Sequence, residues 1–368
     1  MTNKLSLYIH IPFCVKKCDY CAFYSIPNAD DALKESYFKA LLSQIGFFRT
    51  DRIIGSVYFG GGTPPMLGID RLCKLISFVG SRFTLADDCE ITVEVNPNTV
   101  DYDSLLRLRL SGANRLSVGI QAADDKILAS IGRIHSFAQA ERCINNARLA
   151  GFNNVSADII FALPYQSCEC FVSGVKKIMS TNPDHISAYS LQLEEGTPLF
   201  ERRQELVFPD EEAEEEQYES LCALLTENGY THYEISSFCK AGFESRHNLN
   251  YWARGEYVGF GAAAHSFFGG KRFSAPADVN LYINEAERSL FAPTDYVSAP
   301  FISDEEAEEE RILLGLRTSF GALLPKSAHR KAERIASLGY GSFKDGRLAL
   351  NSRGFRVSNG IIAEILSD

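Results

Sequence analysis

The feature that most constrains this chain is a run of three cysteines within eight residues, Cys14-x3-Cys18-x2-Cys21. Three thiolates at this spacing can bind three corners of a cubic iron–sulfur cluster and leave the fourth iron open to a substrate. A ferredoxin cluster or a structural zinc site takes four protein ligands instead. No fourth cysteine or histidine follows nearby, where the chain has Phe23 and Tyr24. The run therefore favours a cluster with one open iron.

Two other interpretations of the cysteine run stay open on these residues alone. The thiols could form a zinc knuckle with a distant histidine, or they could be three unrelated buried side chains. The preceding segment, Leu5–Ile11, weighs against both, because it reads as a short apolar strand that places the cysteines on the loop after its carboxyl end. Ligands bind at this end of the strands in parallel sheets and barrels.

Length, composition and charge narrow the classes of protein. With 368 residues, 45% of them hydrophobic and 23% charged, the chain suits one barrel with an appendage. A formal charge of −10 argues against a nucleic-acid partner. We see no leader and no apolar stretch of about 18 residues, so we expect a cytoplasmic protein with reduced cysteines. The acidic runs Asp210–Glu216 and Asp304–Glu310 are expected to be solvated helix faces.

Short apolar runs alternate with longer helical segments in the first half of the chain, as in a parallel α/β sheet. Strands are predicted at Leu5–Ile11, Ser56–Gly60, Glu90–Val95, Asn114–Gly119, Asn154–Phe161 and His185–Gln192. Helices are predicted at Ala32–Phe47, Ile69–Phe83, Tyr102–Leu110, Ala138–Leu149 and Cys170–Met179. Six strands are too few for a closed eight-stranded barrel.

The alternation ends near Thr197, and two further regions follow. Segments expected to extend the edge of the sheet are a charged helix at Asp210–Asn228, Thr231–Phe238 and the Gly- and Ala-rich Gly259–His265. From Ser303 a helical unit begins, in which Lys344–Arg347 between two apolar runs indicates a β-hairpin. This unit looks like a small winged-helix-like α+β domain. We therefore expect domains at residues 1–200, 201–300 and 301–368.

Two motifs carry a resemblance to a known superfamily. The first is Tyr8–Cys14 (YIHIPFC), which leads into the cysteine run, and the second is Tyr58–Pro64 (YFGGGTP). Together they resemble the radical S-adenosylmethionine (SAM) superfamily. Within it the chain is similar to the oxygen-independent coproporphyrinogen III oxidase-like family, which includes that oxidase and a heme chaperone. The similarity extends from Leu5 to the segment Arg311–Arg317.

The resemblance implies a partial (β/α)6 barrel and a [4Fe–4S] cluster bound by Cys14, Cys18 and Cys21. SAM would chelate the open iron through its amine and carboxylate. An electron from a separate donor would then pass through the cluster and break the sulfonium bond of SAM. The protein's part is to hold that bond beside the cluster and to exclude water.

Several residues near the strand ends are candidates to bind SAM. Gly60–Gly62 would let backbone carbonyls approach a ligand ammonium, although a glycine triplet more often marks only a tight turn. Glu94 and Asp158 lie in apolar strands, where an unpaired charge is costly, and Arg133 could clasp a carboxylate. Each could equally pair with a protein neighbour. The resemblance implies two SAM positions, one formed by Tyr8, Gly61 and Glu94, the other by Tyr20, Gly62, Thr63, Gln121, Arg133 and Asp158.

The segment His247–Trp252 (HNLNYW) separates the candidate functions. An exposed histidine can ligate heme iron, and Tyr251 and Trp252 could flank the macrocycle, although a histidine among aromatic residues is more often structural. The six residues fit the HNxxYW element associated with heme binding in the chaperone branch. His265, in the Gly/Ala-rich segment, is a second and weaker candidate ligand.

Two differences from the oxidase also favour the chaperone branch. The oxidase has a further cysteine two residues after the third, where this chain has Phe23, and a long N-terminal extension, whereas the first strand here begins at Leu5. We therefore expect a heme chaperone without that oxidase activity, which delivers heme to acceptor proteins of unknown identity, membrane-bound ones included. The alternatives are an oxygen-independent coproporphyrinogen III oxidase and, from another class, a zinc-binding structural protein.

Overall fold

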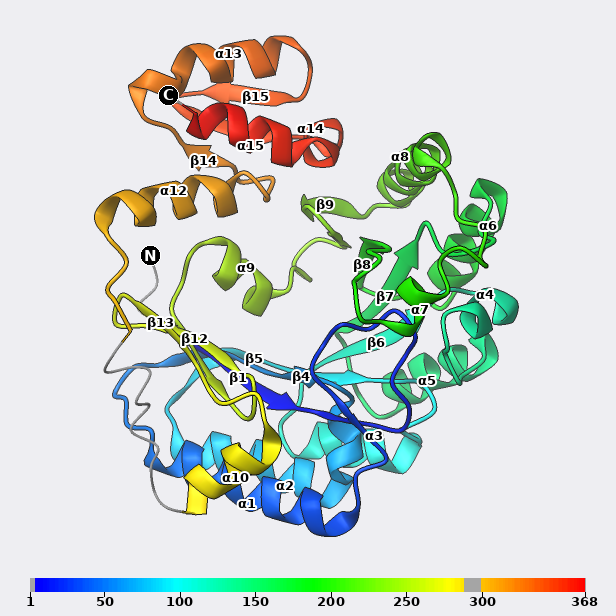
Figure 1. The fold of residues 1–368 in the computed structure, drawn as a ribbon, viewed down its shortest axis with the longest axis vertical. Coiled ribbons are helices and arrows are strands. Elements are labelled where there is room, and N and C mark those ends of the chain that lie inside the picture. The colour runs from blue at the N-terminus through cyan, green and yellow to red at the C-terminus, as the bar shows by residue number, and fades with distance from the viewer. Residues whose placement is uncertain (1–3, 288–298, 368) are drawn as a thin grey trace.

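The computed structural model describes residues 4–287 and 299–367, and one large sheet organises most of them (Figure 1). Its strands are β1 (Leu5–Ile11), β4 (Ile54–Gly61), β5 (Leu85–Val95), β6 (Arg115–Gln121), β7 (Val155–Phe161), β8 (His185–Ser190), β9 (Thr231–Glu234), β10 (Ser237–Cys239), β11 (Tyr257–Phe260), β12 (His265–Phe268) and β13 (Lys271–Ser274). Their order is β13-β12-β11-β1-β4-β5-β6-β7-β8-β10-β9. The edge strands β13 and β9 do not pair with each other, so the sheet is open.

The centre of this sheet is the parallel half-barrel that the sequence predicts. Strands β1, β4, β5, β6, β7 and β8 pair in parallel with their neighbours in that order. In β1, Leu5, Leu7, Ile9 and Ile11 are fully buried, and the intervening positions are mostly buried as well. The strand is buried on both sides because helices cover one face of the sheet and the barrel interior lies on the other. The prediction of an α/β fold with a partial barrel is confirmed.

Helices connect the parallel strands and cover the outer face of the sheet. These connecting helices are α1 (Asp31–Phe47), α2 (Ile69–Arg82), α3 (Tyr102–Leu110), α4 (Asp125–Ser130), α5 (Phe137–Leu149) and α6 (Cys168–Ser180). Four helices that do not connect these strands come later in the chain: α7 (Pro198–Glu201), α8 (Glu211–Glu227), α9 (Arg246–Trp252) and α10 (Val279–Glu287). Asp30 caps α1 by accepting from the Leu33 N–H at 2.8 Å. Ser136 and Gln139 form a capping box that fixes the start of α5.

Short strands extend the half-barrel at both edges, in the region where the sequence predicts such an extension. Strand β11 adds to β1 in parallel, and β12 and β13 follow as antiparallel strands. At the other edge, β10 pairs with β8 and β9 in antiparallel fashion. Between these edges α9 lies on the concave side of the curved sheet, in contact with β4 (Figure 1). The segment HNLNYW is therefore part of the barrel interior.

The C-terminal segment forms a separate unit beside the sheet (Figure 1). It comprises α12 (Asp304–Gly315), β14 (Ala322–Leu323), the 3-10 turn η2 (Lys326–Ala328), α13 (His329–Ser337), β15 (Gly341–Lys344), β16 (Arg347–Leu350), α14 (Ser352–Arg356) and α15 (Ser358–Leu366). The predicted hairpin is confirmed, since Phe343 of β15 pairs with Leu348 of β16. The unit has its own apolar core, which includes Leu316, Phe355 and Ile362. That core supports our proposal of a domain at 301–368, while the boundary at residue 200 stays a prediction.

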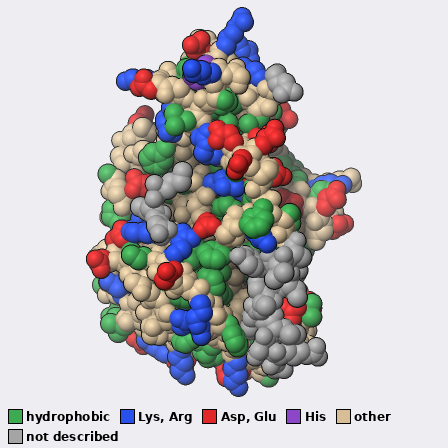
Figure 2. All heavy atoms as spheres, turned by 90° about the vertical axis from the view of Figure 1, so that its left-hand side faces the viewer, with side chains coloured by type: hydrophobic (Ala, Val, Ile, Leu, Met, Phe, Trp, Pro, Cys, Tyr) green, Lys and Arg blue, Asp and Glu red, His purple; other side chains and the backbone are tan. Residues whose placement is uncertain are grey.

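No helix within the described ranges is long and apolar enough to cross a membrane. On the face shown in Figure 2, Lys and Arg side chains lie among Asp and Glu side chains.

The acidic run at Asp304–Glu310 agrees only in part with the expectation of a solvated helix face. Most of Asp304–Glu310 is exposed at the start of α12, but Glu310 is half-buried, and its ion pairs are described below.

Candidate cofactor site and adjoining cavity

The cysteine run leaves the carboxyl end of β1, as the sequence predicts. Two short strands, β2 (Phe13–Cys14) and β3 (Ile26–Pro27), pair in parallel and tie the two ends of the loop together. Cys14, Cys18 and Cys21 carry free, partly accessible thiols. The loop therefore presents all three thiols where a ligand can reach them.

These thiols differ in arrangement from a site for a single metal ion. Within residues 4–287 and 299–367, no three His, Cys, Asp or Glu side chains converge as such a site requires. A structural zinc ion needs four ligands around one point, whereas in a cubic cluster each cysteine binds a different iron. Burial raises the pKa of Cys14 and of Cys21, and iron coordination would overcome this by deprotonating the thiols. The loop suits a cluster better than a zinc ion.

A chain of polar contacts joins Cys14 to Cys18 through Thr63 and Asn96, which follow β4 and β5, and through Arg133, which follows α4. The Thr63 hydroxyl donates to Cys14 Sγ at 3.7 Å and accepts from Asn96 Nδ2 at 2.8 Å. Asn96 Oδ1 in turn accepts from Arg133 at 2.6 Å, and Arg133 donates to Cys18 Sγ at 3.3 Å. Two of the predicted SAM residues, Thr63 and Arg133, are thus brought to the cysteines. The chain of contacts fixes the shape of the loop and places the positive charge of Arg133 beside Cys18.

Arg133 retains a free donor in this position. It also donates to the Gly119 carbonyl at 2.6 Å, but its buried Nε has no partner in the described part of the chain. A Cβ built on Gly119 would lie 3.1 Å from both Asn96 Oδ1 and Gln121 Nε2 and 3.3 Å from Arg133. The glycine thus lets three polar groups converge beside the cysteine loop. An unpaired buried donor among them fits a ligand carboxylate or hydroxyl, as the predicted SAM position requires.

Glu94 is the acidic group at the end of β5. Its carboxylate accepts from the Tyr58 hydroxyl at 2.7 Å and from the Gly61 N–H at 3.3 Å. Burial raises the pKa of Glu94 to about 7, and the Tyr58 hydrogen bond opposes the rise only in part. No cation forms a salt bridge with Glu94 among the residues described. A ligand ammonium would restore the ionised form, as the predicted SAM position for Tyr8, Gly61 and Glu94 requires.

The glycine turn after β4 lies directly against the cysteine loop. Gly61 has φ of +111°, and a Cβ there would lie 2.5 Å from the His10 ring. A Cβ on Gly62 would lie 2.8 Å from the Phe13 carbonyl oxygen and 3.0 Å from Cys14 Sγ. Any side chain at Gly61 or Gly62 would displace the residues that carry the cysteines. The 3-10 turn η1 (Pro64–Leu67) follows.

The other predicted SAM residues occupy two parts of the site. The Tyr8 hydroxyl bonds to His10 Nδ1 at 3.0 Å, and its ring stacks on Tyr58. Tyr20 interacts with Cys18, in the cysteine loop itself. Asp158 lies deeper in the sheet, where it accepts from Ser117 at 2.8 Å and from a second serine of its own strand at 3.1 Å. Burial raises the pKa of Asp158, and these serines provide its hydrogen bonds. SAM contacts for all three residues stay predictions.

His247, the predicted heme ligand, is not exposed. Only 1% of its surface is accessible, its Nδ1 lies 2.9 Å from Ser56 Oγ, and its Nε2 lies 2.8 Å from the Tyr251 hydroxyl. Because Ser56 donates its own proton to Ser6, His247 donates from Nδ1 and accepts at Nε2. Burial lowers the pKa of His247 to about 3, so it is neutral. The lone pair that would bind iron is occupied by Tyr251.

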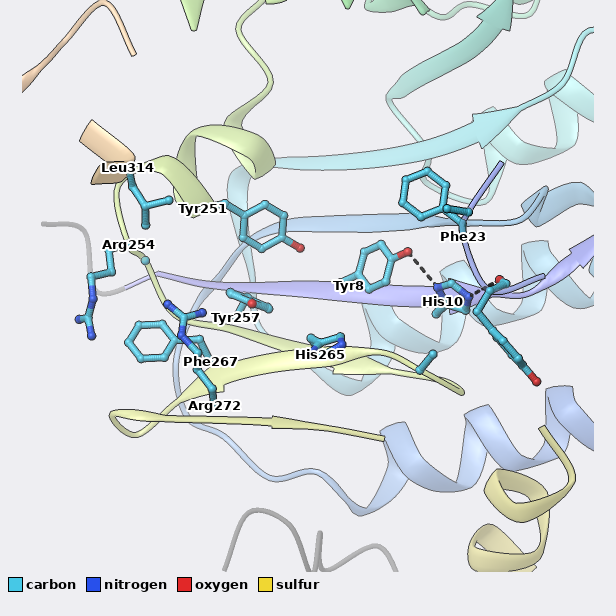
Figure 3. Close-up of a pocket in the computed structure, with 14 residues that line it drawn as sticks. Tyr8, His10, Phe23, Tyr251, Arg254, Tyr257, His265, Phe267, Arg272 and Leu314 are labelled. Carbon is cyan, nitrogen blue, oxygen red and sulfur yellow. Dashed lines mark hydrogen bonds between the residues drawn. The ribbon is translucent and has the colours of Figure 1, made fainter. Parts of the chain in front are cut away.

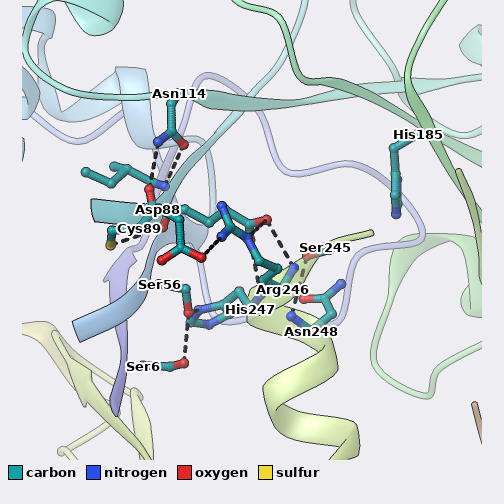
Figure 4. Close-up of polar contacts among 12 residues, drawn as sticks. Ser6, Ser56, Asp88, Cys89, Asn114, His185, Ser245, Arg246, His247 and Asn248 are labelled. Carbon is teal, nitrogen blue, oxygen red and sulfur yellow. Dashed lines mark hydrogen bonds and ion pairs between the residues drawn. The ribbon is translucent and has the colours of Figure 1, made fainter. Parts of the chain in front are cut away.

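The helix that carries His247 is fixed from its N-terminus (Figure 4). Glu90 of β5 accepts from the backbone N–H of Arg246 at 3.0 Å and from that of His247 at 3.1 Å. Ser245 caps the helix by accepting from the Asn248 N–H. The carboxylate satisfies donors that the first turn of a helix leaves free. Trp252, at the other end, bonds to Glu234 and does not reach the cavity described next.

A cavity of about 630 Å³ opens beside the cysteine loop (Figure 3). The residues that line it include Tyr8, His10, Phe23, Tyr24, Tyr251, Arg254, Tyr257, His265, Phe267, Arg272 and Leu314. Its inner end is formed by β1 and the cysteine loop, and its outer end by β12, β13 and α12. Tyr251 and His265, both predicted from the sequence, face this cavity, whereas His247 lies behind Tyr251.

Two guanidinium groups at the outer end of the cavity share one carboxylate. Arg254 Nε lies 2.6 Å from Glu310 Oε2, and Arg272 Nη2 lies 2.9 Å from the same oxygen. Both guanidinium groups also lie over the Phe267 ring, at 4.7 and 4.9 Å from its centroid. Burial raises the pKa of Glu310, but hydrogen bonds from Arg272 and Arg254 outweigh it and leave that pKa below its usual value. The C-terminal unit thus contributes a wall to the cavity.

Sequence comparison relates this geometry to known proteins. A profile of the radical SAM superfamily matches residues 8–176. The heme chaperone HemW of Lactococcus lactis subsp. lactis is 32% identical over 378 residues, which cover 99% of this chain and 97% of that protein. The chain belongs to the HemW family of the radical SAM superfamily. The E. coli member, also named heme chaperone HemW, is 38% identical over 264 residues, 71% of this chain and 69% of that protein.

Structure comparison agrees on the fold. Coproporphyrinogen III oxidase (HemN) from E. coli, described as a radical SAM enzyme, superposes with a TM-score of 0.84 over 99% of this chain and 90% of that chain. The two sequences are 21% identical, so the likeness shows the fold alone. The resemblance drawn from the two sequence motifs is confirmed, and the relatives from Lactococcus lactis and E. coli are both named HemW.

In this HemW-family chain several residues of the site carry no motif that the sequence reveals. Asn96 connects Thr63 to Arg133, and its position after the apolar run of β5 is the signal that could have found it. Arg254 and Arg272 carry no sequence signal, because their meeting point depends on a hairpin and on Glu310 of α12. The reason is physical: Arg254 lies in the turn after α9 and Arg272 lies on β13, and both meet Glu310 only because these elements pack against α12 in the folded chain.

Proposed function

We propose that this protein is a cytoplasmic heme chaperone, which binds a [4Fe–4S] cluster, SAM and heme and delivers the heme to acceptor proteins. The observation that carries the proposal is the cavity of about 630 Å³ with aromatic walls and two arginines, next to the cysteine loop. Ligand pockets of this size and lining suit flat, largely apolar molecules with a charged edge. The names of the relatives from Lactococcus lactis and E. coli support the same function.

Residues of the cysteine loop and of the neighbouring strand ends would have different roles in cofactor binding. Cys14, Cys18 and Cys21 would bind the cluster, which supplies single electrons to SAM when it is loaded. Thr63 and Arg133 would donate hydrogen bonds to the thiolates, and such contacts tune the potential of a cluster. Glu94 would bind the ammonium of SAM. The electron donor is a separate protein.

The oxidase alternative is less well supported. The position two residues after Cys21 is Phe23, a residue that is 71% exposed and lines the cavity. An exposed phenylalanine next to a cofactor loop suits contact with a flat apolar ligand or with an acceptor protein better than it suits cluster binding. The zinc alternative is disfavoured because the chain belongs to the radical SAM superfamily and lacks converging zinc ligands in the described ranges.

One preparation tests both functions. The full-length protein, with its cluster reconstituted anaerobically, is assayed for hemin binding by absorption and for conversion of coproporphyrinogen III with SAM and reductant. We expect stable heme binding and no decarboxylation. Formation of protoporphyrinogen IX would favour the oxidase, and a colourless protein that retains zinc and no iron would favour the structural alternative.

A further inference from the structure

The cavity and the HNLNYW segment offer iron two different histidines. His265 lies on β12, its side chain is exposed, and it lines the cavity (Figure 3). No hydrogen bond or ion pair engages its ring in the part of the chain that the structure describes. His247 is buried, and both of its ring nitrogens are engaged. Heme iron could bind the His265 ring without breaking a hydrogen bond of that ring. At His247 the iron would have to displace the Tyr251 hydroxyl.

We infer that the cavity is the heme seat, with His265 as the axial ligand and Arg254 and Arg272 as the partners of a heme propionate. The inference rests on the proposed function and names the residues that perform it. His247 then has a different role, because its bond to Tyr251 makes it a positioning residue for the cavity wall. A histidine that accepts a hydrogen bond from a tyrosine hydroxyl holds that ring in one orientation.

The arginine pair already binds the chemical group that heme would bring. Glu310 presents a carboxylate to Arg254 at 2.6 Å and to Arg272 at 2.9 and 3.3 Å. A propionate is also a carboxylate, so it can replace Glu310 without new recognition chemistry. No acidic residue is among the lining residues in the described ranges, so Glu310, which pairs with both arginines, is the carboxylate that a propionate would replace.

The walls between His265 and the arginines suit a porphyrin. Tyr251, Tyr257 and Phe267 supply aromatic surface, and Leu314 of α12 adds an aliphatic contact. Flat apolar ligands are bound by such surfaces, while a few charged groups fix their orientation. The iron ligand would lie on the sheet and the propionate partners at the outer rim, which matches a macrocycle whose metal is central and whose carboxylates lie on one edge.

Hemin titration of the full-length, cluster-loaded protein tests the ligand assignment. We expect His265→Ala to weaken hemin binding at least about tenfold, the scale of one lost strong contact, and to change the Soret band and the ferric EPR spin state. His247→Ala should weaken binding but keep the histidine-ligated spectrum at saturating hemin. His329→Ala, on remote α13, is the matched control and should match the wild type.

A second arm tests the propionate contact independently of the iron. Arg272→Gln should weaken hemin binding, and the dimethyl ester of hemin should bind wild type and Arg272→Gln equally, because it has no charge for the arginine to bind. Retention of the wild-type spectrum and affinity in His265→Ala, with the histidine signal lost in His247→Ala, would overturn the inference and leave the chaperone function standing. If wild-type protein binds no hemin at all, the proposed function itself fails.

Discussion

Arg254 Nε lies 2.6 Å from Glu310 Oε2, a contact that ties α12 of the C-terminal unit to the rim of the cavity. Arg272 binds the same carboxylate from the facing hairpin. A carboxylate ligand that enters the cavity competes with Glu310 for both cations. Binding of a ligand carboxylate and binding of Glu310 by the arginine pair are therefore alternatives, which suits a protein that must both hold and release its cargo.

Removal of the Glu310 charge should strengthen binding of a carboxylate ligand. In Glu310→Gln the arginines are free of their internal competitor, so we expect hemin affinity to rise a few-fold and limited proteolysis after α12 to become faster. Glu309→Gln removes the same charge from an exposed position of the same helix and is the matched control. Equal hemin affinity in the two variants would argue against competition by Glu310.

Cluster binding should depend on each cysteine of the run. We expect Cys14→Ala, Cys18→Ala or Cys21→Ala to lose nearly all cluster iron, because two thiolates cannot hold a cube whose fourth iron is open. Cys143→Ala, in the core of α5, should retain it, since Cys143 is buried away from the loop. Iron and sulfide analysis after anaerobic reconstitution provides the measurement. An iron content near that of the wild type in Cys18→Ala would contradict the assignment of these three cysteines as cluster ligands.

SAM affinity should rise with pH around neutrality. Free Glu94 has a pKa of about 7 because it is buried, and a bound ammonium would lower that pKa. Binding then releases a proton, so affinity increases as pH rises from about 6 to 8 and levels off above the free pKa. Glu94→Gln should bind weakly at every pH and lose this slope. Equilibrium dialysis with SAM measures it, and a wild-type affinity that falls across this range would contradict the assignment.

His247 should matter for stability as well as for the cavity. His247→Ala leaves the hydroxyls of Ser56 and Tyr251 without their shared partner inside the barrel. We expect the free energy of unfolding to fall by about 2–4 kcal/mol. Urea denaturation of the metal-free protein measures this loss. An unchanged midpoint would mean that the buried network contributes little.

The sequence predicted the half-barrel closely because its strands are buried on both faces. Strands β1 and β7 are rich in apolar residues, and their ends fall within a residue of the predicted bounds. β5 begins at Leu85 rather than at the predicted Glu90, because its first half is polar and partly exposed. The cysteine loop and the glycine turn are predictable for a different reason, because the residues of each motif lie close together in the sequence.

Long-range contacts set the limit of prediction at the site. His247 meets Ser56 across 191 residues, so no local pattern indicated its burial or the loss of its free lone pair. Glu310 lies in a run expected to be solvated, and only the placement of α12 beside β13 brings it to Arg272. Pairings of this kind depend on how edge strands and the C-terminal unit dock, which composition and periodicity do not determine.

Heme transfer is the most direct test of the proposed function. The full-length protein is loaded with hemin, separated from free heme, and mixed with a heme-free b-type hemoprotein, and absorption spectra follow both proteins over time. The account predicts that heme leaves this protein and appears in the acceptor, at a rate that increases with acceptor concentration. Heme that stays bound, or leaves at a rate independent of the acceptor, would contradict delivery by a chaperone.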